Sequence, residues 1–371
     1  MVIGIDGNEA NAKNRVGSGT YAHELLRQFS KNKSHAFTIY LKEPPVGDLP
    51  VENSNFKYHI FGPKKLWTQF ALPIQLTLKG PKIDVFFSTA HYGPRFSKVP
   101  YVVTIHDLSY LHFPDLFKKD DLMQLTSWSK YSVEKSAHII CPSQSTKDDI
   151  VESYQIEPSK ISVTYEGYDQ SRFKPESKVK IESVKSKYKI KGDYIIFVGT
   201  LQPRKNVERL IEAFSKVILK SQFSSLKLVI SGKKGWLYDP ILSKAKELKI
   251  ENSVVFCDFV PDKDLPALIS GAKLYVNPSL WEGFGIPVIE AQACGVPTVV
   301  SKTSSLPEIA GDSAILVDPT NIASIADGIV QGLDPKIASL QIAKGFKNIK
   351  RFSWENCARQ TLKVLEKAAH V

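Results

Sequence analysis

The sequence predicts an α/β protein made of two doubly wound domains, each built on a parallel sheet. Short runs of β-branched and aromatic residues alternate with amphipathic stretches from end to end, which is typical of βαβ units. The length of 371 residues is too great for one ordinary core and suits two domains. The expected strands form two sets, at 2–6, 36–41, 85–88, 101–107, 137–142 and 161–165, and at 194–199, 226–232, 254–260, 274–278, 297–301 and 314–318.

The boundary between the two sets is expected where the chain becomes polar. The run Y-D-Q-S-R-F-K-P is followed by a lysine-rich stretch, and together they are the only long polar interval in mid-chain. This predicts domains at 1–172 and 173–350. The final segment, 351–371, reads F-S-W-E-N-C-A-R-Q-T-L-K-V-L-E-K-A, with a serine N-cap and apolar residues at helical spacing, so we expect a terminal helix there.

Composition narrows the classes of protein that fit. A hydrophobic content of 43% with 23% charged residues is that of a globular protein, and no stretch approaches the roughly 20 apolar residues of a transmembrane helix. The four cysteines are scattered, which predicts reduced thiols in a cytoplasmic protein and no metal site. The net charge of +11 includes seven lysines in 174–191, which suit a solvated linker, or attraction to anionic lipid or nucleotide. No signature of nucleic-acid recognition is present.

Glu282 and Glu290 bracket the run E-G-F-G-I-P-V-I-E. Its glycines predict a loop that feeds a helix from about Pro287, because proline is favoured in the first turn of a helix. Backbone N–H groups at such a start suit an anionic ligand, and carboxylates suit the hydroxyl groups of a sugar. From spacing alone, an ordinary helix start with one favourable and one solvated acid fits equally well.

Arg204 and Lys205 stand in G-T-L-Q-P-R-K, directly after an expected strand and near the start of the next helix. Two cations beside a helix N-terminus suit a diphosphate, since arginine can bind two oxygens at once. Positive charge at a helix start is otherwise unfavourable to the helix dipole, which argues against a purely structural role.

Three further segments are candidates for function. Gly19 lies in V-G-S-G-T-Y-A, a loop and helix start too far from its strand for a dinucleotide fingerprint. His106, in T-I-H-D-L, is expected at the carboxyl end of a strand, where ligands bind in parallel sheets. From the residues alone, a buried histidine bonded to a backbone carbonyl fits this position better. The segment 64–80 has apolar residues between lysines and suits either a membrane interface or a core-packing helix that Pro73 interrupts.

The E-x₇-E run resembles the motif of retaining glycosyltransferases of family four, which have the two-domain GT-B fold. Further sequence similarity to this family extends along most of the chain. The resemblance implies that the terminal helix returns to the first domain, that Glu290 holds the ribose hydroxyls and that Glu282 contacts the donor sugar. It implies that the catalytic residues are His106, Arg204, Lys205 and Glu282, with Asp107 as the orienting partner of His106. The donor-binding residues that it implies are Gly19, Thr200, Phe259, Val260, Leu265, Gly283, Phe284, Gly285, Ile286 and Glu290.

Within this family, the sequence most resembles mannosyltransferases that assemble bacterial O-antigen and related polysaccharides. It implies a retaining, metal-independent enzyme without a cofactor that moves mannose from GDP-mannose to a saccharide or lipid-linked acceptor. A same-face mechanism is expected, because no second carboxylate is evident for a covalent intermediate. Glucosyl, rhamnosyl or N-acetylhexosaminyl transfer, a nucleotide-sugar 2-epimerase and a non-catalytic binding module stay open. So does peripheral contact with the inner membrane surface.

Overall fold

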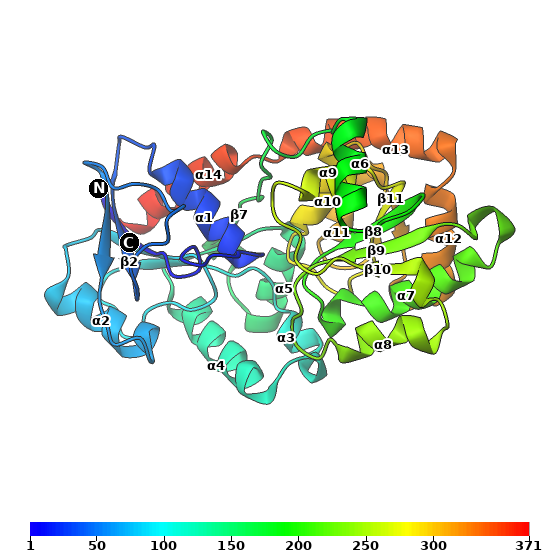
Figure 1. Cartoon of the computed structure of the whole chain (residues 1–371). Helices are drawn as coiled ribbons and strands as arrows, with labels where there is room; N and C mark the ends of the chain where they lie inside the picture. Colours follow the sequence, from blue (N-terminus) through cyan, green and yellow to red (C-terminus); the bar gives the residue numbers. More distant parts are fainter. Residues whose placement is uncertain (371) are drawn as a thin grey trace. The chain divides into compact units, whose positions relative to one another are not determined.

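The computed structural model describes residues 1–370 and divides the chain into two compact units. Unit 1 contains Met1–Gly167 and the end of the chain from Phe352, and unit 2 is Tyr168–Arg351. Each unit is a parallel sheet with helices on both faces (Figure 1). The two doubly wound sheets that the sequence predicts are therefore confirmed.

Unit 1 has a seven-stranded sheet in the order β3-β2-β1-β4-β5-β6-β7, and every pairing in it is parallel. Its strands are β1 Val2–Asp6, β2 Ala36–Leu41, β3 Phe56–Ile60, β4 Val85–Ser88, β5 Tyr101–Thr104, β6 His138–Cys141 and β7 Ile161–Val163. Every residue of β4 and β5 is buried, as expected for strands covered by helices on both sides.

The helices of unit 1 are α1 Ser18–Phe29, α2 Leu72–Ile74, α3 Ser109–His112, α4 Lys119–Lys135, α5 Gln144–Tyr154 and α14 Trp354–Ala368. The predicted terminal helix is α14, and it lies against α1 and against β4, β5 and β6 (Figure 1). Ser353 caps it by accepting a hydrogen bond from the Asn356 N–H at 3.1 Å. At Gly167 an added Cβ would lie 2.2 Å from the Trp354 nitrogen, so only glycine allows this close approach. Residue 371 lies outside the described residues.

Unit 2 has a six-stranded sheet in the order β10-β9-β8-β11-β12-β13, again wholly parallel. Its strands are β8 Tyr194–Val198, β9 Lys227–Ser231, β10 Val254–Phe256, β11 Leu274–Asn277, β12 Thr298–Ser301 and β13 Ala314–Val317. Its helices are α6 Lys178–Lys187, α7 Val207–Ile218, α8 Asp239–Glu247, α9 Leu265–Ser270, α10 Ile286–Ala293, α11 Leu306–Ala310, α12 Ile322–Gly332 and α13 Pro335–Asn348.

The core of unit 2 explains why these segments fold as they do. Helices α7, α8 and α12 share one apolar cluster with the sheet strands, and α7 carries buried residues at helical spacing (Val207, Leu210, Ile211, Phe214). Helix α10 packs on β11 and β12, with α9 and α13 beside it. Burial of both sheet faces requires nearly continuous apolar strands, which is the pattern that made them predictable.

In each sheet the strand order reverses at one place, between β1 and β4 in unit 1 and between β8 and β11 in unit 2. Loops that leave the carboxyl ends of the two central strands diverge there, and ligands of open α/β sheets bind at this point. The candidate ligand-binding loops are therefore those after β1 and β4 in unit 1 and those after β8 and β11 in unit 2.

Two elements differ from the sequence prediction. The edge strand β3 was not predicted, because only its first residue is buried and its sequence, F-K-Y-H-I, lacks a buried apolar run. The segment around Pro73 is helical on both sides of the proline, as π-helical turns Trp67–Ala71 and Gln75–Lys79 joined by α2. Pro73 lies in the first turn of α2, where proline is tolerated.

Candidate active site

The loops after β8 and β11 are joined to each other at the switch point of unit 2. The first passes through a 3₁₀ turn at Pro203–Lys205 to Asn206, which has the left-handed φ of 60° and precedes α7. The Asn206 side-chain amide donates to the Pro278 carbonyl at 2.9 Å and to the Pro319 carbonyl at 2.7 Å. The Leu280 N–H donates to the Arg204 carbonyl at 2.9 Å. The bonds with Pro278 and Leu280 fix the two loops side by side, and the bond to Pro319 joins them to the loop after β13.

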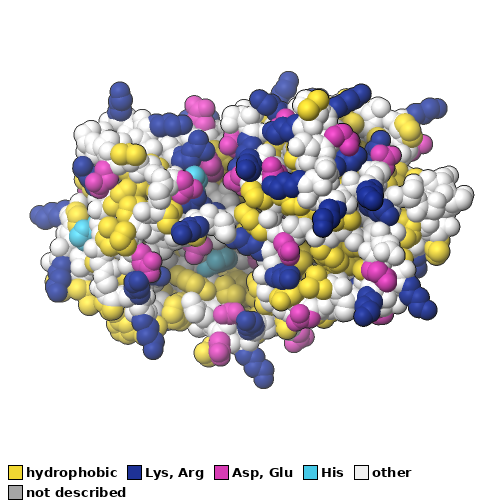
Figure 2. Space-filling model, in the orientation of Figure 1, with side chains coloured by type: hydrophobic (Ala, Val, Ile, Leu, Met, Phe, Trp, Pro, Cys, Tyr) yellow, Lys and Arg dark blue, Asp and Glu magenta, His cyan; other side chains and the backbone are white. Residues whose placement is uncertain are grey.

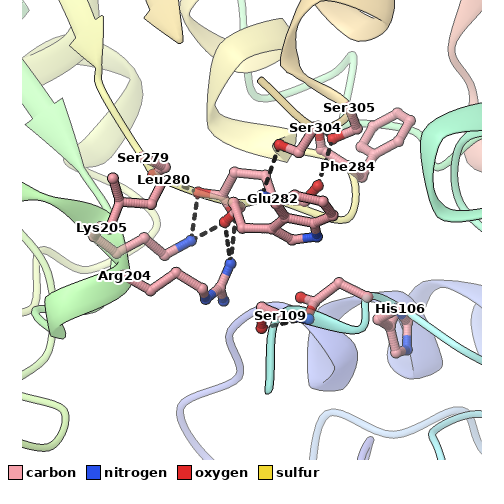
Figure 3. A network of polar contacts seen from close by, with 12 residues as sticks. His106, Ser109, Arg204, Lys205, Ser279, Leu280, Glu282, Phe284, Ser304 and Ser305 are labelled. Atoms are coloured by element: carbon pink, nitrogen blue, oxygen red, sulfur yellow. Dashed lines mark hydrogen bonds and ion pairs between the residues drawn. The ribbon is translucent and has the colours of Figure 1, made fainter. Parts of the chain in front are cut away.

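Glu282 is the centre of a buried ionic cluster between these loops (Figure 3). Lys205 Nζ lies 2.5 Å from Glu282 Oε1 and 2.7 Å from Oε2, so the ammonium group binds both carboxylate oxygens. Arg204 Nη1 lies 3.3 Å from Oε2 and also donates to the Trp281 carbonyl. The Ser279 hydroxyl lies 2.8 Å from Oε1. The side chains of Glu282, Arg204 and Lys205 are 9%, 12% and 15% exposed, so the cluster is only slightly open to solvent.

The charges of this cluster determine the ionisation of Glu282. Burial favours the neutral acid, but the charges of Lys205 and then Arg204 outweigh it and hold the pKa of Glu282 below its usual value. One carboxylate with two cations leaves a net positive charge at the start of a helix. Arginine and lysine side chains beside a helix start suit a doubly charged anion such as a diphosphate.

The loop from Gly283 to Gly285 is shaped by its glycines and by two serines from the β12–α11 loop. Gly285 has a φ of 103°, a conformation that side chains rarely adopt, and it is the N-cap of α10. The Ser304 hydroxyl accepts a hydrogen bond from the Glu282 N–H at 2.9 Å. The Ser305 hydroxyl lies 2.9 Å from the Glu282 carbonyl and 3.0 Å from the Phe284 carbonyl. Helix α10 then begins at Ile286, one residue before the predicted start.

Glu290 is in a different electrostatic environment from Glu282, although both belong to the same motif. It lies in α10, 9% exposed, and burial raises its pKa to about 8. Arg172 lowers the pKa, whereas Asp262 and Asp169 raise it. Both glutamates lie near the Tyr275 hydroxyl. Burial, and then the charges of Glu282 and Glu290, raise the pKa of Tyr275. The motif thus supplies one ionised acid and one acid that holds its proton near neutral pH.

The remaining expected donor residues of unit 2 lie in loops after β8 and β10. Thr200 is in the loop that carries Arg204. Phe259 and Val260 follow β10, and Leu265 is the first residue of α9. Val260 is buried, and Lys233 lies 5.2 Å from the centre of the Phe259 ring. Phe259 and Val260 were expected inside the strand 254–260, but β10 ends at Phe256 and both residues lie in the loop that follows.

In unit 1, His106 lies just beyond β5 with both ring nitrogens facing oxygen atoms. Nε2 is 3.0 Å from the Thr89 carbonyl and Nδ1 is 3.5 Å from Glu166 Oε1. Burial lowers the pKa of His106, but the hydrogen bond and charge of Glu166 outweigh it, so the net pKa is raised. Two acceptors around one imidazole favour the protonated ring. The rings of His106 and Tyr21 meet edge to face, with their centres 4.9 Å apart.

The carboxylate that orients His106 is therefore Glu166, and the expectation that Asp107 does so was wrong. Asp107 Oδ1 accepts hydrogen bonds from the Ser109 N–H at 2.9 Å and from its hydroxyl at 2.5 Å, and it acts on His106 by charge alone. Glu166 was missed because it lies 60 positions along the chain, in T-Y-E-G-Y. A lone acid between apolar residues after a strand is the only signal that the sequence gives.

Gly19 lies in the first turn of α1, and its neighbourhood explains the glycine. An added Cβ would lie 3.0 Å from the Glu9 carbonyl, where the loop after β1 crosses the helix start. The loop after β1 is one of the two at the switch point of unit 1.

Neither a metal cluster nor a membrane span is found in residues 1–370. No group of three or more His, Cys, Asp or Glu side chains there could hold a metal ion. None of the helices within that range is long and apolar enough to cross a membrane. The four cysteines form no disulfide bond.

Comparison with known proteins gives the family of this chain. Residues 179–346 match the model "Glycosyl transferases group 1", and residues 16–172 match "Glycosyltransferase Family 4". O-antigen chain mannosyltransferase B of Escherichia coli is 32% identical over 279 residues, which are 73% of this chain and 72% of that protein. O-antigen chain mannosyltransferase RfbU of Salmonella typhimurium is 28% identical over 217 residues, 58% of this chain and 56% of that protein.

Among solved structures, HepE of Anabaena in complex with UDP and glucose superposes with a TM-score of 0.74 at 17% identity, covering 99% of each chain. This likeness shows the fold, and the sequence matches show the family. A switch-point cluster of two cations and a carboxylate, two parallel sheets and matches along both units lead to one conclusion: the chain belongs to the glycosyltransferases with the GT-B fold.

Proposed function

We propose that this glycosyltransferase is a retaining mannosyltransferase that uses GDP-mannose as donor and a saccharide or lipid-linked acceptor in polysaccharide synthesis. The observation that carries the proposal is the Lys205–Glu282–Arg204 cluster at the switch point of unit 2, where a diphosphate would meet two cations. The similarity to an O-antigen chain mannosyltransferase supports mannose as the sugar.

In this proposal unit 2 binds the donor. Arg204 and Lys205 stabilise the diphosphate as it leaves, and electrostatic stabilisation of developing charge usually contributes more to catalysis than any other single effect. Glu282 holds both cations in place and contacts the sugar hydroxyls. Glu290 binds the ribose hydroxyls, and loop residues Gly283–Ile286 contribute backbone N–H groups. Phe259, Val260 and Leu265 surround the base, with Thr200 near the phosphates.

Unit 1 contributes Gly19, His106 and the acceptor site. Both nitrogens of His106 already face protein oxygens, so the ring cannot accept a proton from the acceptor hydroxyl. The protonated ring suits stabilisation of negative charge, and a donor phosphate oxygen takes the acceptor proton on the face that the leaving group vacates. The two cations supply the charge that a metal supplies elsewhere, so transfer proceeds without a metal or other cofactor. The protein works at the cytoplasmic face of the membrane, in peripheral contact with it.

The first experiment is thermal unfolding with GDP, UDP, dTDP, ADP or NAD, each in EDTA and in magnesium. A ligand at 100 times its dissociation constant adds about 2.7 kcal/mol of stability. We expect a shift with GDP that EDTA does not change. A shift with UDP or dTDP would keep a transferase and reject mannose, and stabilisation by NAD alone would reject the site assignment.

The second experiment measures chemistry. Purified protein is incubated with GDP-mannose and candidate saccharide acceptors, and the product is examined by nuclear magnetic resonance. Retention of the donor's anomeric configuration, in EDTA, is the expected result. An inverted product would reject the same-face mechanism, and a changed sugar without an acceptor would indicate an epimerase.

A further inference from the structure

The helical segment around Pro73 leaves four large apolar side chains uncovered along one edge. Leu66, Phe70, Ile74 and Leu78 are 46%, 61%, 45% and 77% exposed. Phe70, Ile74 and Leu78 recur every four residues, close to one helical turn, so they share one side of the segment, and Leu66 is its N-cap. We call these four residues the α2 stripe. Isolated exposed apolar residues are ordinary, but a continuous row of them indicates an interaction surface.

The opposite face of the same segment is firmly packed. Trp67, Ala71, Leu72 and Leu76 are buried in the core of unit 1. The Trp67 ring stacks on Phe61 with centres 5.0 Å apart, and its indole N–H donates to the Phe61 carbonyl at 3.3 Å. The inner face therefore fixes the segment to its unit. The stripe is not needed for that packing and is held outward.

All charged side chains within the segment are basic. Residues 61–82 contain four lysines and no acidic residue. Lys64, Lys65, Lys79 and Lys82 are all exposed and lie at the two ends of the stripe. Lys64 pairs with Glu43 at 2.5 Å, an acid from outside the segment. Figure 2 shows yellow apolar atoms and dark-blue basic atoms together at the lower left, where Figure 1 places α2.

We infer that the α2 stripe is the surface by which unit 1 docks on an anionic lipid bilayer. A row of Leu, Ile and Phe can enter the boundary between headgroups and acyl chains, and lysines at both ends meet the negative headgroups. A second copy of this chain would bring like charges together and suits the surface less well. This docking specifies the membrane contact of the proposed function, on which it rests, and would hold unit 1 beside lipid-linked acceptors.

The test measures binding of the full chain to vesicles without any nucleotide or acceptor, so its result does not depend on transferase activity. The protein is sedimented with vesicles of phosphatidylcholine containing phosphatidylglycerol and with vesicles of phosphatidylcholine alone. We expect binding to the anionic vesicles and a loss of binding when salt is raised, because surface charges are screened.

Two variants address the two parts of the surface. Phe70→Ser with Leu78→Ser removes the most exposed apolar side chains and should weaken vesicle binding about tenfold or more. Lys65→Glu with Lys79→Glu should weaken it by a similar factor. All four side chains are exposed, so unfolding followed by circular dichroism should stay unchanged.

Matched controls separate this surface from the overall charge. Lys178→Glu with Lys191→Glu makes the same change of net charge on the lysine-rich stretch of unit 2, and should leave binding nearly unchanged. Val51→Ser with Leu219→Ser removes two apolar side chains that are 86% and 84% exposed elsewhere.

The inference would be overturned if the stripe variants bound as well as the original protein, or if the control variants lost as much binding. The inference would also be overturned if the protein did not bind vesicles but formed a dimer, and if Phe70→Ser with Leu78→Ser dissociated that dimer. The stripe would then be a surface for self-association.

Discussion

Replacing Glu290 with glutamine should make the protein more stable at alkaline pH, because the buried carboxyl is costly to ionise. Burial raises the pKa of Glu290 from 4.5 to about 8, against the opposing charge of Arg172. In the unfolded chain the group ionises near 4.5. The folded state therefore has its full advantage below about pH 4.5 and loses stability as the pH rises toward 8, above which the loss is constant.

The magnitude follows from the difference between these two pKa values. A difference of about 3.5 at 1.36 kcal/mol for each pH unit corresponds to about 5 kcal/mol at pH 8 and above. Glutamine has the same shape and does not ionise, so its free energy of unfolding lacks this pH dependence. We expect the variant and the original protein to differ little near pH 4.5 apart from a constant offset, and the difference to grow by several kcal/mol by pH 8.

The assay is urea unfolding of both proteins across this pH range, fitted with a transition for each unit, because two-domain proteins need not unfold in one step. Groups that do not interact with Glu290 titrate alike in both proteins, so they cancel in the difference. Glu251→Gln, which removes an exposed carboxyl of unit 2, is the matched control and should show no such trend. A difference that does not change with pH would show that Glu290 ionises normally and would refute the reasoning.

Three further changes test the two sites. Lys205→Met leaves the Glu282 carboxylate buried with one cation fewer, so urea unfolding should show a loss of about 3 kcal/mol, and donor consumption should stop. Lys205→Met with Glu282→Gln should recover stability but not sugar transfer. Recovery of both would contradict the catalytic role of Lys205. Glu166→Gln should lower the pKa of His106 in a nuclear magnetic resonance titration. In the original protein the raised pKa of His106 gives stability that is full below pH 6.5 and is lost as the pH rises through the folded-state pKa. The stability of the variant should not fall with pH in this way. An unchanged His106 titration would reject the contact. Gly285→Ala forces a side chain into a φ of 103° and should cost about 1 kcal/mol or more in urea unfolding, and weaker GDP binding by calorimetry would place the loop at the donor.

The candidate site shows where sequence reasoning succeeds. The run of glycines and Pro287 correctly predicted a loop that enters a helix, because these residues restrict the backbone locally. Arg204 and Lys205 were expected at a helix start, and they lie in the 3₁₀ turn before α7. What the local pattern could not give is the partner of these cations: Glu282 is 77 positions away and meets Lys205 only because β8 and β11 are adjacent in the sheet.

The same division between local and distant contacts applies to the other acids. Glu282 and Glu290 look alike in the motif, yet the first is ionised by Lys205 and Arg204 and the second holds its proton because burial outweighs Arg172. Burial and neighbouring charge are properties of the assembled fold, so the sequence could not predict that the pKa values of the two glutamates shift in opposite directions. Glu166 was missed for the same reason, since its contact with His106 joins segments after two different strands.

By itself the sequence determined the two parallel sheets, the terminal helix and the candidate loops, because apolar runs, caps and glycines act over a few residues. Strand order, the ion pairs of Glu282, the orientation of His106 by Glu166 and the outward face of residues 66–78 were decided only by the tertiary structure. Each of these depends on which distant segments exclude water from one another, and burial and charge contacts of that kind exist only once the chain has folded.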